Sequence, residues 1–361
     1  MMKRKSMTTH IRCAFLPIIC TLLSCGQSYS VQESASSDAS KTKLVLLRDE
    51  AAGIEAAIAP AKGGELSGLA VRFQDQWIET LYLARDYSPR QSWTGKAPFL
   101  WPATGRNFPE DLRQRRAAGE RFDGGAYNFN GKRYKMPIHG FARDLPWELE
   151  TSSAGADGAR ARLSLADNEE TRRFYPFGFR LTVEYLVADG RLDISYEIHA
   201  SDENSEKMMF SMGNHITFRN PLVEGSDPAD VVLTTPSTME ILKTSYGVPT
   251  DETRARSHAD GVKLGDFEKL QAVSLTGYSG REPYVLLQDP QGLSIRMSHT
   301  SDRIPEQPVV LFNVWGDALG GFISPEPWVG LQNSLVLGKG LTYLEPGEDF
   351  HWRIRITPAA E

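Results

Sequence analysis

Cysteine is almost absent from this sequence of 361 residues, and the three that occur, Cys13, Cys20 and Cys25, all stand near the N-terminus. The rest of the chain can therefore form no disulfide framework, no cysteine-ligated zinc cluster and no thiol nucleophile. An excess of basic residues is also missing, because the formal net charge is -6. A nucleic-acid binder needs a basic face to neutralise phosphates, so we expect no nucleic-acid partner.

Several motifs of common enzyme classes are missing as well. The sequence has no Gly-x-Ser-x-Gly elbow of serine hydrolases, no Gly-Lys-Ser/Thr phosphate loop and no Gly-x-Gly-x-x-Gly dinucleotide motif. His139 and His215 are far apart in the sequence, and neither belongs to a closely spaced pair of His, Asp or Glu ligands. We therefore expect neither a metal ion nor a cofactor.

The first 25 residues have the layout of an export signal. A basic stretch is followed by an apolar segment at 13–23, which is too short to span a bilayer as a permanent helix. The segment ends in Leu-Leu-Ser-Cys-Gly, which resembles a bacterial lipobox, so we expect residues 1–24 to be a signal peptide and Cys25 to be lipidated. An ordinary cleaved signal with incidental cysteines is the alternative. Either signal takes the protein out of the cytoplasm, and the first anchors it in a bacterial envelope, in the periplasm.

Residues 25–42 are rich in serine and nearly free of large aliphatic side chains. They cannot bury enough apolar surface to order themselves, so we expect a flexible tether that connects the lipid to the domain. From residue 43 to 361 we find no internal repeat and no linker, which predicts one domain. We expect this domain to contact the membrane only through the N-terminal lipid anchor.

The pattern from residue 43 onward is mostly that of strands. Residues 180–187 and 191–198 alternate apolar and polar side chains, and the Ala-Asp-Gly between them is typical of a hairpin turn. Short helices are expected only around 110–119 and 266–272. The pattern predicts an all-β protein, a large antiparallel β-sandwich. Further strands are expected at 43–47, 159–165, 284–288, 293–297, 309–313 and 350–356.

Four segments, at 98–108, 136–147, 209–218 and 322–330, place ionisable side chains among aromatic and turn residues. In apolar surroundings, desolvation raises the pKa of a carboxylate and lowers that of a histidine, so both can exchange protons near neutrality. Glu326, His139 and His215 are candidates for this chemistry. Each also has a structural interpretation, as a turn carboxylate held by backbone donors or as a neutral core histidine.

The other polar and aromatic residues of these segments have two interpretations too. Arg106 can bridge loops, and Arg143 is expected to form a local ion pair with the adjacent Asp144. Four tryptophans can either stack on a sugar ring or belong to the core: Trp101, Trp147, Trp315 and Trp328.

Taken in order, these segments resemble the aldose 1-epimerase (galactose mutarotase-like) family, and in particular a branch of bacterial proteins that carries His-Gly-Phe-Ala-Arg. That motif stands here at 139–143, and the resemblance extends over about residues 44–356. It implies the large antiparallel supersandwich of the family. The other segments that carry the resemblance are 175–181, 210–215, 325–330 and 338–347.

Carried over position by position, the resemblance implies that Glu326 is the general base and His215 the general acid. His139 and Arg106 would bind the sugar hydroxyls and the ring oxygen. Trp328, directly after the catalytic segment, is expected to contact the substrate.

Two positions depart from the family pattern. Gln271 stands where the family has a substrate-binding carboxylate, and Asp266 lies nearby as a second candidate for that role. Asn214 occupies a place where glycine is more common, beside His215. Both departures bear on which sugar is bound and on whether the reaction is retained.

The sequence therefore predicts a cofactor-independent isomerase that interconverts the α and β anomers of a hexose by acid–base ring opening and closure. The alternative from a different class is a noncatalytic carbohydrate-binding lipoprotein on the same fold. A hexose-6-phosphate 1-epimerase is a weaker alternative, because Arg106 and Arg143 supply few cations for a phosphate.

Overall fold

The structure is a computed structural model, and the expected signal peptide and Cys25, the expected lipidation site, lie outside its described residues. Within the described ranges, no helix has the length and apolar character needed to cross a membrane. The described residues are 28–83, 87, 94–109, 111–120, 125–280 and 282–360.

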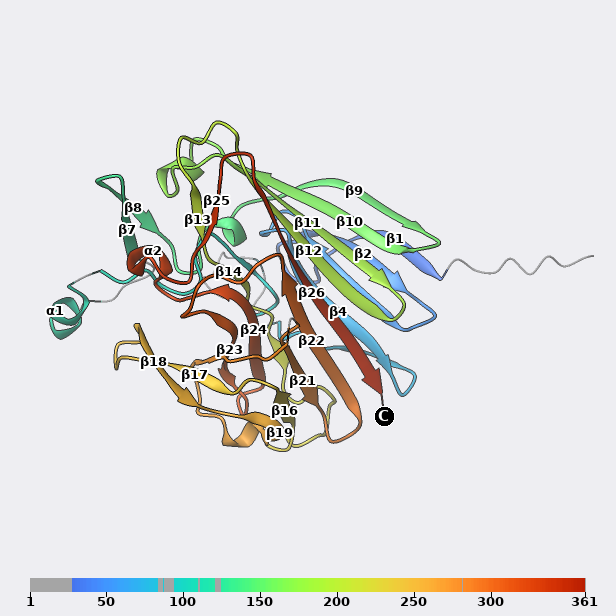
Figure 1. Cartoon of the computed structure of the whole chain (residues 1–361). Coiled ribbons are helices and arrows are strands. Elements are labelled where there is room, and N and C mark those ends of the chain that lie inside the picture. The colour runs from blue at the N-terminus through green and yellow to red at the C-terminus, as the bar shows by residue number, and fades with distance from the viewer. Residues whose placement is uncertain are drawn as a thin grey trace, which may run out of the picture.

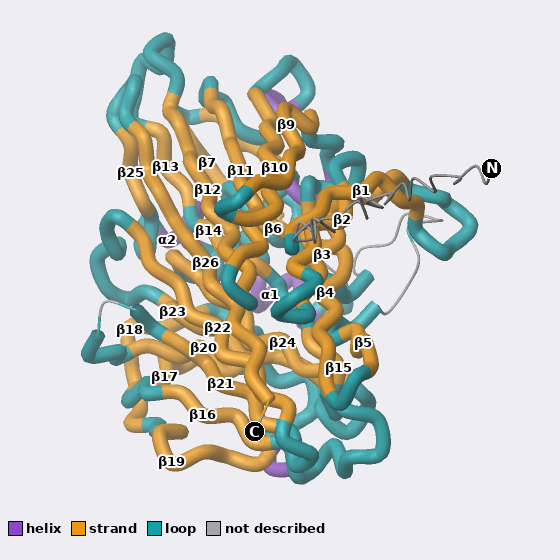
Figure 2. Tube along the Cα trace, turned by 90° about the vertical axis from the view of Figure 1, so that its right-hand side faces the viewer, coloured by secondary structure: helices purple, strands orange, loops and turns teal. Residues whose placement is uncertain are grey.

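Strands make up most of the described chain, and two large antiparallel sheets form the body of the molecule (Figures 1 and 2). The all-β sandwich expected from the sequence is confirmed. In spatial order, the nine-stranded sheet consists of β19 (His258–Lys263), β16 (Val232–Thr235), β21 (Tyr284–Gln288), β22 (Leu293–Ser301), β26 (Asp349–Ala360), β12 (Arg191–Ala200), β11 (Phe179–Ala188), β10 (Gly158–Ala166) and β9 (Glu148–Gly155).

The second large sheet has eight strands and carries the candidate site. Its strands follow the order β18 (Pro249–Ala255), β17 (Met239–Lys243), β20 (Val273–Thr276), β23 (Val310–Asp317), β24 (Phe322–Gly330), β14 (Met212–Asn214) and β6 (Phe99–Leu100), and β15 (Phe218–Arg219) also pairs with β24.

Three smaller sheets complete the fold. The five-stranded sheet contains β1 (Tyr29–Ala35), β2 (Lys43–Asp49), β3 (Ile54–Ala59), β4 (Glu65–Phe73) and β5 (Gln76–Glu79), in that order. Of the two two-stranded sheets, one is the hairpin of β7 (Gly125–Phe129) and β8 (Lys132–Met136), and the other pairs β13 (Met208–Phe210) with the distant β25 (Thr342–Leu344).

The hairpin expected at 180–198 is confirmed. Strands β11 and β12 pair in register from Phe179–Ala200 to Ala188–Arg191. Asp189 and Gly190 in the turn have φ angles of 50° and 70°. Two successive residues with positive φ define a type I′ turn, whose twist matches that of the flanking strands.

The expected tether at 25–42 is corrected for residues 29–35, which form strand β1 along the edge of β2. Sequence composition is misleading here, because an edge strand is held through backbone hydrogen bonds and does not need large aliphatic side chains. Tyr29 and Val31 add partly buried apolar surface that packs against the core.

The helix expected around 110–119 forms as α1 (Leu112–Ala117), whereas the helix expected at 266–272 does not form. Only one 3₁₀ turn, Leu264–Asp266, occurs there, and Phe267 is already extended. Leu270 has a φ of 58°, in the left-handed region that a right-handed helix cannot include. A short helix that the sequence did not predict, α2 (Ser334–Leu337), follows β24.

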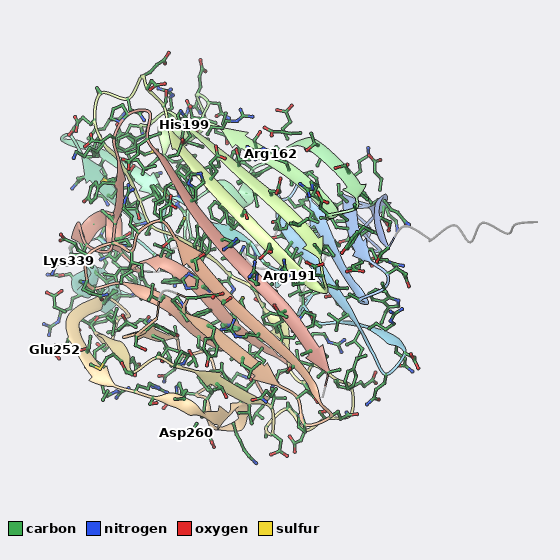
Figure 3. All side chains as sticks on the ribbon, turned by 45° about the vertical axis from the view of Figure 1, so that its right-hand side comes forward. Arg162, Arg191, His199, Glu252, Asp260 and Lys339 are labelled. Atoms are coloured by element: carbon green, nitrogen blue, oxygen red, sulfur yellow. The ribbon has the colours of Figure 1, made fainter. Side chains whose placement is uncertain are left out.

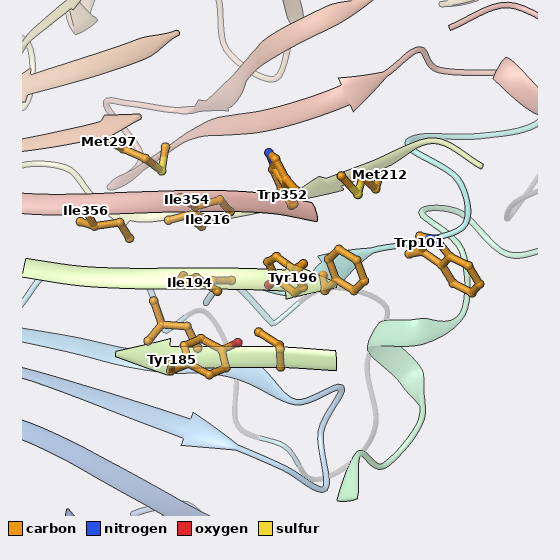
Figure 4. Packing of buried hydrophobic residues seen from close by; sticks show 14 of the residues in the cluster. Trp101, Tyr185, Ile194, Tyr196, Met212, Ile216, Met297, Trp352, Ile354 and Ile356 are labelled. Atoms are coloured by element: carbon orange, nitrogen blue, oxygen red, sulfur yellow. The ribbon is translucent and has the colours of Figure 1, made fainter. Parts of the chain in front are cut away.

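The core lies against the nine-stranded sheet, and both the eight-stranded and the five-stranded sheets contribute side chains to it. Trp352 of β26 and Tyr196 of β12 are directly paired, and Tyr185 of β11 lies beside Ile194, two residues along β12 (Figure 4). Phe99 of β6 stacks on Tyr196 with 4.3 Å between ring centroids. This contact therefore ties the site-bearing sheet to the nine-stranded sheet. Charged side chains such as Arg162 and Lys339 lie at the periphery (Figure 3).

Candidate active site

Glu326 lies in the middle of β24, a strand that is buried along its whole length. On one side β24 pairs with β23, so that Glu326 faces Asn313. On the other side β24 pairs with β15 through residues 322–323 and with β14 through residues 328–329. Pro325 and Pro327 fall between these two pairings, where a strand can lack an N–H donor without losing a ladder hydrogen bond.

The segment between β14 and β15 lies opposite the part of β24 that pairs with neither strand, and it brings His215 to Glu326. His215 directly follows β14, and its backbone N–H donates to the carbonyl of Pro98 at 3.0 Å. Gly213, two residues earlier on the same face, pairs with Trp328. A Cβ atom at Gly213 would stand 2.5 Å from Cδ1 of Trp328, so only glycine lets the indole pack here.

Nε2 of His215 and Oε1 of Glu326 are 3.6 Å apart. Both side chains are almost fully enclosed, with 7% and 2% of their surfaces exposed. Nδ2 of Asn313 donates to Oε1 at 3.1 Å, and Nε1 of Trp328 donates to Oε2 at 3.0 Å. The carboxyl group is therefore held in place by one donor on each oxygen.

Burial shifts the protonation equilibria of both groups toward their neutral forms. Desolvation raises the pKa of Glu326 to about 8, although the hydrogen bonds from Asn313 and Trp328 favour the ionised form. Desolvation lowers the pKa of His215 to about 3, and the positive charge of Arg143 acts in the same direction. Between these two values the His215–Glu326 pair holds one proton, so one member can donate while the other accepts.

The tautomer of His215 follows from its neighbours. The hydroxyl of Thr217 donates to the backbone carbonyl of His215 at 3.1 Å and accepts from Ser324 at 2.8 Å. Its single hydrogen is then used, so the 3.3 Å contact with Nδ1 of His215 is a bond donated by the imidazole. Neutral His215 therefore presents the lone pair of Nε2 toward Glu326.

His139 approaches the same pair from the His-Gly-Phe-Ala-Arg segment. Its ring centroid is 5.5 Å from that of His215 and 6.5 Å from that of Trp328. Nδ1 of His139 accepts from the backbone N–H of Gly105 at 3.1 Å. Burial lowers the pKa of His139 well below its usual value, so the ring is neutral and keeps its hydrogen on Nε2. This N–H is a donor suited to a sugar hydroxyl.

The tight backbone around His139 explains the glycine that follows it. His139 has a φ of 65° and Gly140 a φ of 73°, and Gly140 forms a bridge with Trp101. A Cβ atom at Gly140 would lie 2.0 Å from the carbonyl oxygen of Trp101. Any side chain there would push the His139 turn away from the sheet.

The structure therefore brings His139, His215 and Glu326 together. Arg106 follows Gly105, whose backbone is hydrogen-bonded to His139, and Arg143 lies in the 3₁₀ turn Ala142–Asp144 just after His139. The charges of both arginines lower the pKa of His139, in addition to the larger effect of burial. The local ion pair expected between Arg143 and Asp144 stays a prediction.

Gln271 and Asp266 are exposed and are not brought into contact with the three clustered residues in the described part of the chain. Asp266 ends the 3₁₀ turn Leu264–Asp266, which is tied by a backbone bond from Leu264 to Val231. Gln271 lies on the segment that leads into β20. The substrate-binding roles of both residues stay predictions.

The four tryptophans, which were expected either to stack on a sugar ring or to belong to the core, have different surroundings. Trp101 and Trp147 belong to the main core. Trp328 is 2% exposed and its N–H is used by Glu326, so in the free protein it supports the carboxyl group. Trp315 is half-buried with its ring 5.5 Å from that of His215. Contact of Trp315 or Trp328 with a sugar stays a prediction.

Asn214 does not crowd the site. Its side chain points to the opposite face of β14, where Nδ2 donates to the hydroxyl of Tyr196 at 2.9 Å. This buried bond links β14, the strand that directly precedes His215, to the nine-stranded sheet. The departure from glycine at this position is thus a core contact, which the sequence alone could not distinguish from a contact with substrate.

Sequence reasoning missed the polar residues that hold the site. Asn313 and Ser274 form one hydrogen-bonded row with Glu326, and Thr217 orients His215. Asn313 was detectable as the polar end of an apolar run, whereas Ser274 gives no signal in the sequence.

Among the described residues, no group of three or more His, Cys, Asp or Glu side chains is placed to hold a metal ion.

Comparison with known proteins places this antiparallel β-sandwich, with its buried histidine beside a glutamate, among the sugar epimerases. Residues 115–318 match the sequence model of the aldose 1-epimerase family, and the chain belongs to this family. The match includes His139 and His215 but ends before Glu326. Membership of the particular bacterial branch stays a prediction.

Solved structures confirm the fold. A protein from Synechocystis sp. PCC 6803 is 24% identical with a TM-score of 0.68, over 92% of this chain and all of that one. A galactose mutarotase related enzyme from Lactobacillus acidophilus is 21% identical with a TM-score of 0.67, over 92% and 98%. Galactose 1-epimerase from Lactobacillus acidophilus NCFM is 15% identical with a TM-score of 0.65, over 92% and 99%. At these identities the likeness concerns the fold.

Local sequence similarity extends to two proteins with the name "Putative glucose-6-phosphate 1-epimerase". The protein from Escherichia coli K12 is 35% identical over 81 residues, which are 22% of this chain and 27% of that protein. The protein from Salmonella typhimurium LT2 is 34% identical over 64 residues, 18% of this chain and 21% of that protein. The chain thus spans about a quarter of the length of the curated relatives it matches.

Proposed function

We propose that the protein is an aldose 1-epimerase that interconverts the α and β anomers of a hexose, with Glu326 as general base and His215 as general acid. The observation that carries the proposal is the 3.6 Å separation of Nε2 of His215 and Oε1 of Glu326 in a buried site. Membership of the aldose 1-epimerase family supports the same reaction.

The chemistry needs only proton transfers. Glu326 takes the proton of the C1 hydroxyl while His215 gives a proton to the ring oxygen, so the C1–O bond of the ring breaks and an open-chain aldehyde forms. Rotation about C1–C2 presents the other face of the aldehyde. The reverse transfers then close the ring and restore both groups. Each positioned transfer contributes about 10²- to 10⁴-fold.

The single proton of the His215–Glu326 pair suits this cycle. A neutral carboxyl with a neutral imidazole has the same proton count as a carboxylate with an imidazolium, and the second arrangement is the reactive one. Hydrogen bonds from Asn313 and Trp328 to the carboxylate favour it. The N–H of His139 would bind a sugar hydroxyl at the same site.

Polarimetry tests the proposal directly. Freshly dissolved α-glucose and α-galactose should reach their equilibrium rotation faster with micromolar wild-type protein than without it. We expect Glu326→Gln and His215→Asn to lose at least about 100-fold of this acceleration. Glu252→Gln, at an exposed position on β18, is the matched control. A Glu326→Gln variant as active as the wild type would remove Glu326 from the role of base.

A hexose 6-phosphate is the second candidate substrate. The observation that favours it is the local similarity to the two proteins named for glucose-6-phosphate, together with the charges of Arg106 and Arg143 beside His139. The same polarimetric assay compares kcat/KM for glucose 6-phosphate and glucose. A preference of tenfold or more for the phosphate would select this substrate, and equal values would retain the neutral hexose.

The noncatalytic alternative predicts a different outcome. Calorimetric binding of glucose or galactose without any acceleration of mutarotation would indicate a carbohydrate-binding protein on this fold. Absence of both binding and acceleration with these sugars and with glucose 6-phosphate would contradict the proposed substrates.

We also propose that the protein is exported and anchored in a bacterial envelope through a lipid on Cys25. The basic and apolar N-terminal segments and the lipobox-like Leu-Leu-Ser-Cys support this localisation. Replacing Cys25 by Ala should move the protein from the membrane fraction to the soluble fraction. An unchanged distribution would contradict lipidation.

A further inference from the structure

A row of polar side chains leads away from Glu326 across the eight-stranded sheet. Glu326 on β24 faces Asn313 on β23, Asn313 faces Ser274 on β20, and Ser274 faces Ile241 on β17. The hydroxyl of Ser274 donates to Oδ1 of Asn313 at 3.1 Å, and Nδ2 of Asn313 donates to Glu326. Paired residues of an antiparallel sheet lie on the same face, so all four share the face of the site.

Lys243 stands on this face at the end of the row. It follows Ile241 by two residues on β17, and side chains two apart in a strand lie on the same side. Its Nζ donates to the carbonyl of Ala272 at 3.2 Å, directly before the Val273–Val314 pair. Lys243 is half-buried, and this bond uses one of the three donors of its ammonium group.

The ammonium of Lys243 and the carboxyl of Glu326 interact electrostatically. The charge of Lys243 lowers the pKa of Glu326, against the larger effect of burial, and Glu326 in turn raises that of Lys243. Burial lowers the pKa of Lys243 to about 8, and Glu240 on the same strand opposes this. The groups that face Glu326 are thus His215, Asn313 and Trp328 in contact, and Lys243 from across the row.

We propose that Lys243 is a positioning residue whose positive charge increases the share of Glu326 in the carboxylate form, which is the form that can take the proton of the C1 hydroxyl. Neither the sequence motifs nor the family resemblance assigns a role to Lys243. The inference rests on the proposed function for its catalytic meaning, but the charge coupling can be measured without any sugar.

Two substitutions separate the charge of Lys243 from its hydrogen bond. Lys243→Gln keeps a donor for the carbonyl of Ala272 but removes the charge, whereas Lys243→Arg keeps the charge. The matched control is Lys263→Gln, which makes the same change at an exposed lysine on β19 that pairs with Asp230.

The first measurement is the titration of Glu326 itself, by carbon NMR of protein labelled with ¹³Cδ-glutamate. The Glu326 signal is assigned by its loss in Glu326→Gln. We expect Lys243→Gln to raise the Glu326 pKa by about one unit, as for charges several ångströms apart at the effective dielectric of a protein. Lys243→Arg and Lys263→Gln should leave it near the wild-type value. An unchanged Glu326 titration in Lys243→Gln would overturn the proposal.

The second measurement is the pH dependence of kcat and KM for the sugar that the wild type accepts. Lys243→Gln should lower kcat about tenfold at neutral pH and move the alkaline limb upward by about one unit, with KM little changed. A raised KM with unchanged kcat and pH profile would make Lys243 a sugar-binding residue and overturn the charge role. A wild type inactive on every sugar would refute the proposed function, while the NMR titration would still decide the role of Lys243.

Discussion

Asn313→Leu is the substitution that tests most sharply how the site controls Glu326. It keeps the approximate volume of a residue that is 4% exposed and removes the amide that donates to Oε1 of Glu326. That oxygen is the one facing Nε2 of His215. The substitution therefore weakens the carboxylate form of Glu326 without placing a new charge in the site.

The size of the effect follows from the lost bond. A hydrogen bond to a charged group contributes about 1.5–3 kcal/mol. At 1.36 kcal/mol per pKa unit, its loss raises the Glu326 pKa by about one to two units. The population of the carboxylate–imidazolium arrangement, and with it kcat/KM on the pH plateau, should fall about 10- to 100-fold.

The assay is mutarotation across the pH range, from the acidic plateau through the alkaline limb. Below about pH 8 the wild-type His215–Glu326 pair holds its single proton, so activity should fall only above that pH. In Asn313→Leu the plateau should be lower and the limb should move upward by one to two units. Ser274→Ala, which removes only the donor that orients the amide of Asn313, should give a smaller change of the same kind. A normal plateau together with an unmoved limb in Asn313→Leu would show that the amide of Asn313 does not control the ionisation of Glu326.

Three further predictions concern packing and stability. Gly213→Ala forces the Trp328 indole to move, because the new Cβ would lie 2.5 Å from Cδ1 of Trp328. We expect the free energy of unfolding in urea to fall by about 1–3 kcal/mol and the activity to fall at least about tenfold. Tyr196→Phe removes the buried hydroxyl that accepts from Nδ2 of Asn214, so the free energy of unfolding in urea should fall by about 1–3 kcal/mol. Glu326→Gln should gain stability over the wild type as pH rises from 5 to 9, by about 4 kcal/mol, because the folded carboxyl, with a pKa raised from 4.5 to about 8, keeps a proton that the unfolded chain releases.

Each of these has a result that contradicts it. Gly155→Ala, where a Cβ meets nothing within 4 Å, is the control for Gly213→Ala, and equal behaviour of the two would show that the Trp328 contact is unimportant. If Tyr196→Phe unfolds at the same urea concentration as the wild type, the hydrogen bond between Asn214 and Tyr196 does not stabilise the protein. A stability difference between Glu326→Gln and wild type that does not vary with pH would contradict the raised pKa.

Strands with local signals were predictable from the sequence. The hairpin around Asp189 and Gly190 combines alternation with turn chemistry, and it forms as expected. The expected helix at 266–272 is wrong because Leu270 takes a left-handed conformation that residue type does not reveal. Strand β1 was missed because its stability comes from pairing with the edge of β2, which lies outside its own sequence.

The meeting of His215 and Glu326 depends on the pairing of β14 with β24, a contact between segments more than a hundred residues apart. Spacing in the sequence could not predict it, and only the family resemblance pointed to both residues. Lys243 was overlooked for a related reason. A lysine in a short strand is expected to face solvent. Whether its side of the strand is covered depends on how other segments pack on the sheet, which the local sequence does not show.

A double-mutant cycle on kcat/KM for mutarotation measures whether His215 and Glu326 act as one proton-transferring unit. We expect Glu326→Gln, His215→Asn and the double variant to lose activity to a similar extent, because removing either member disables the pair. Losses that multiply in the double variant would show two independent contributions instead of one unit.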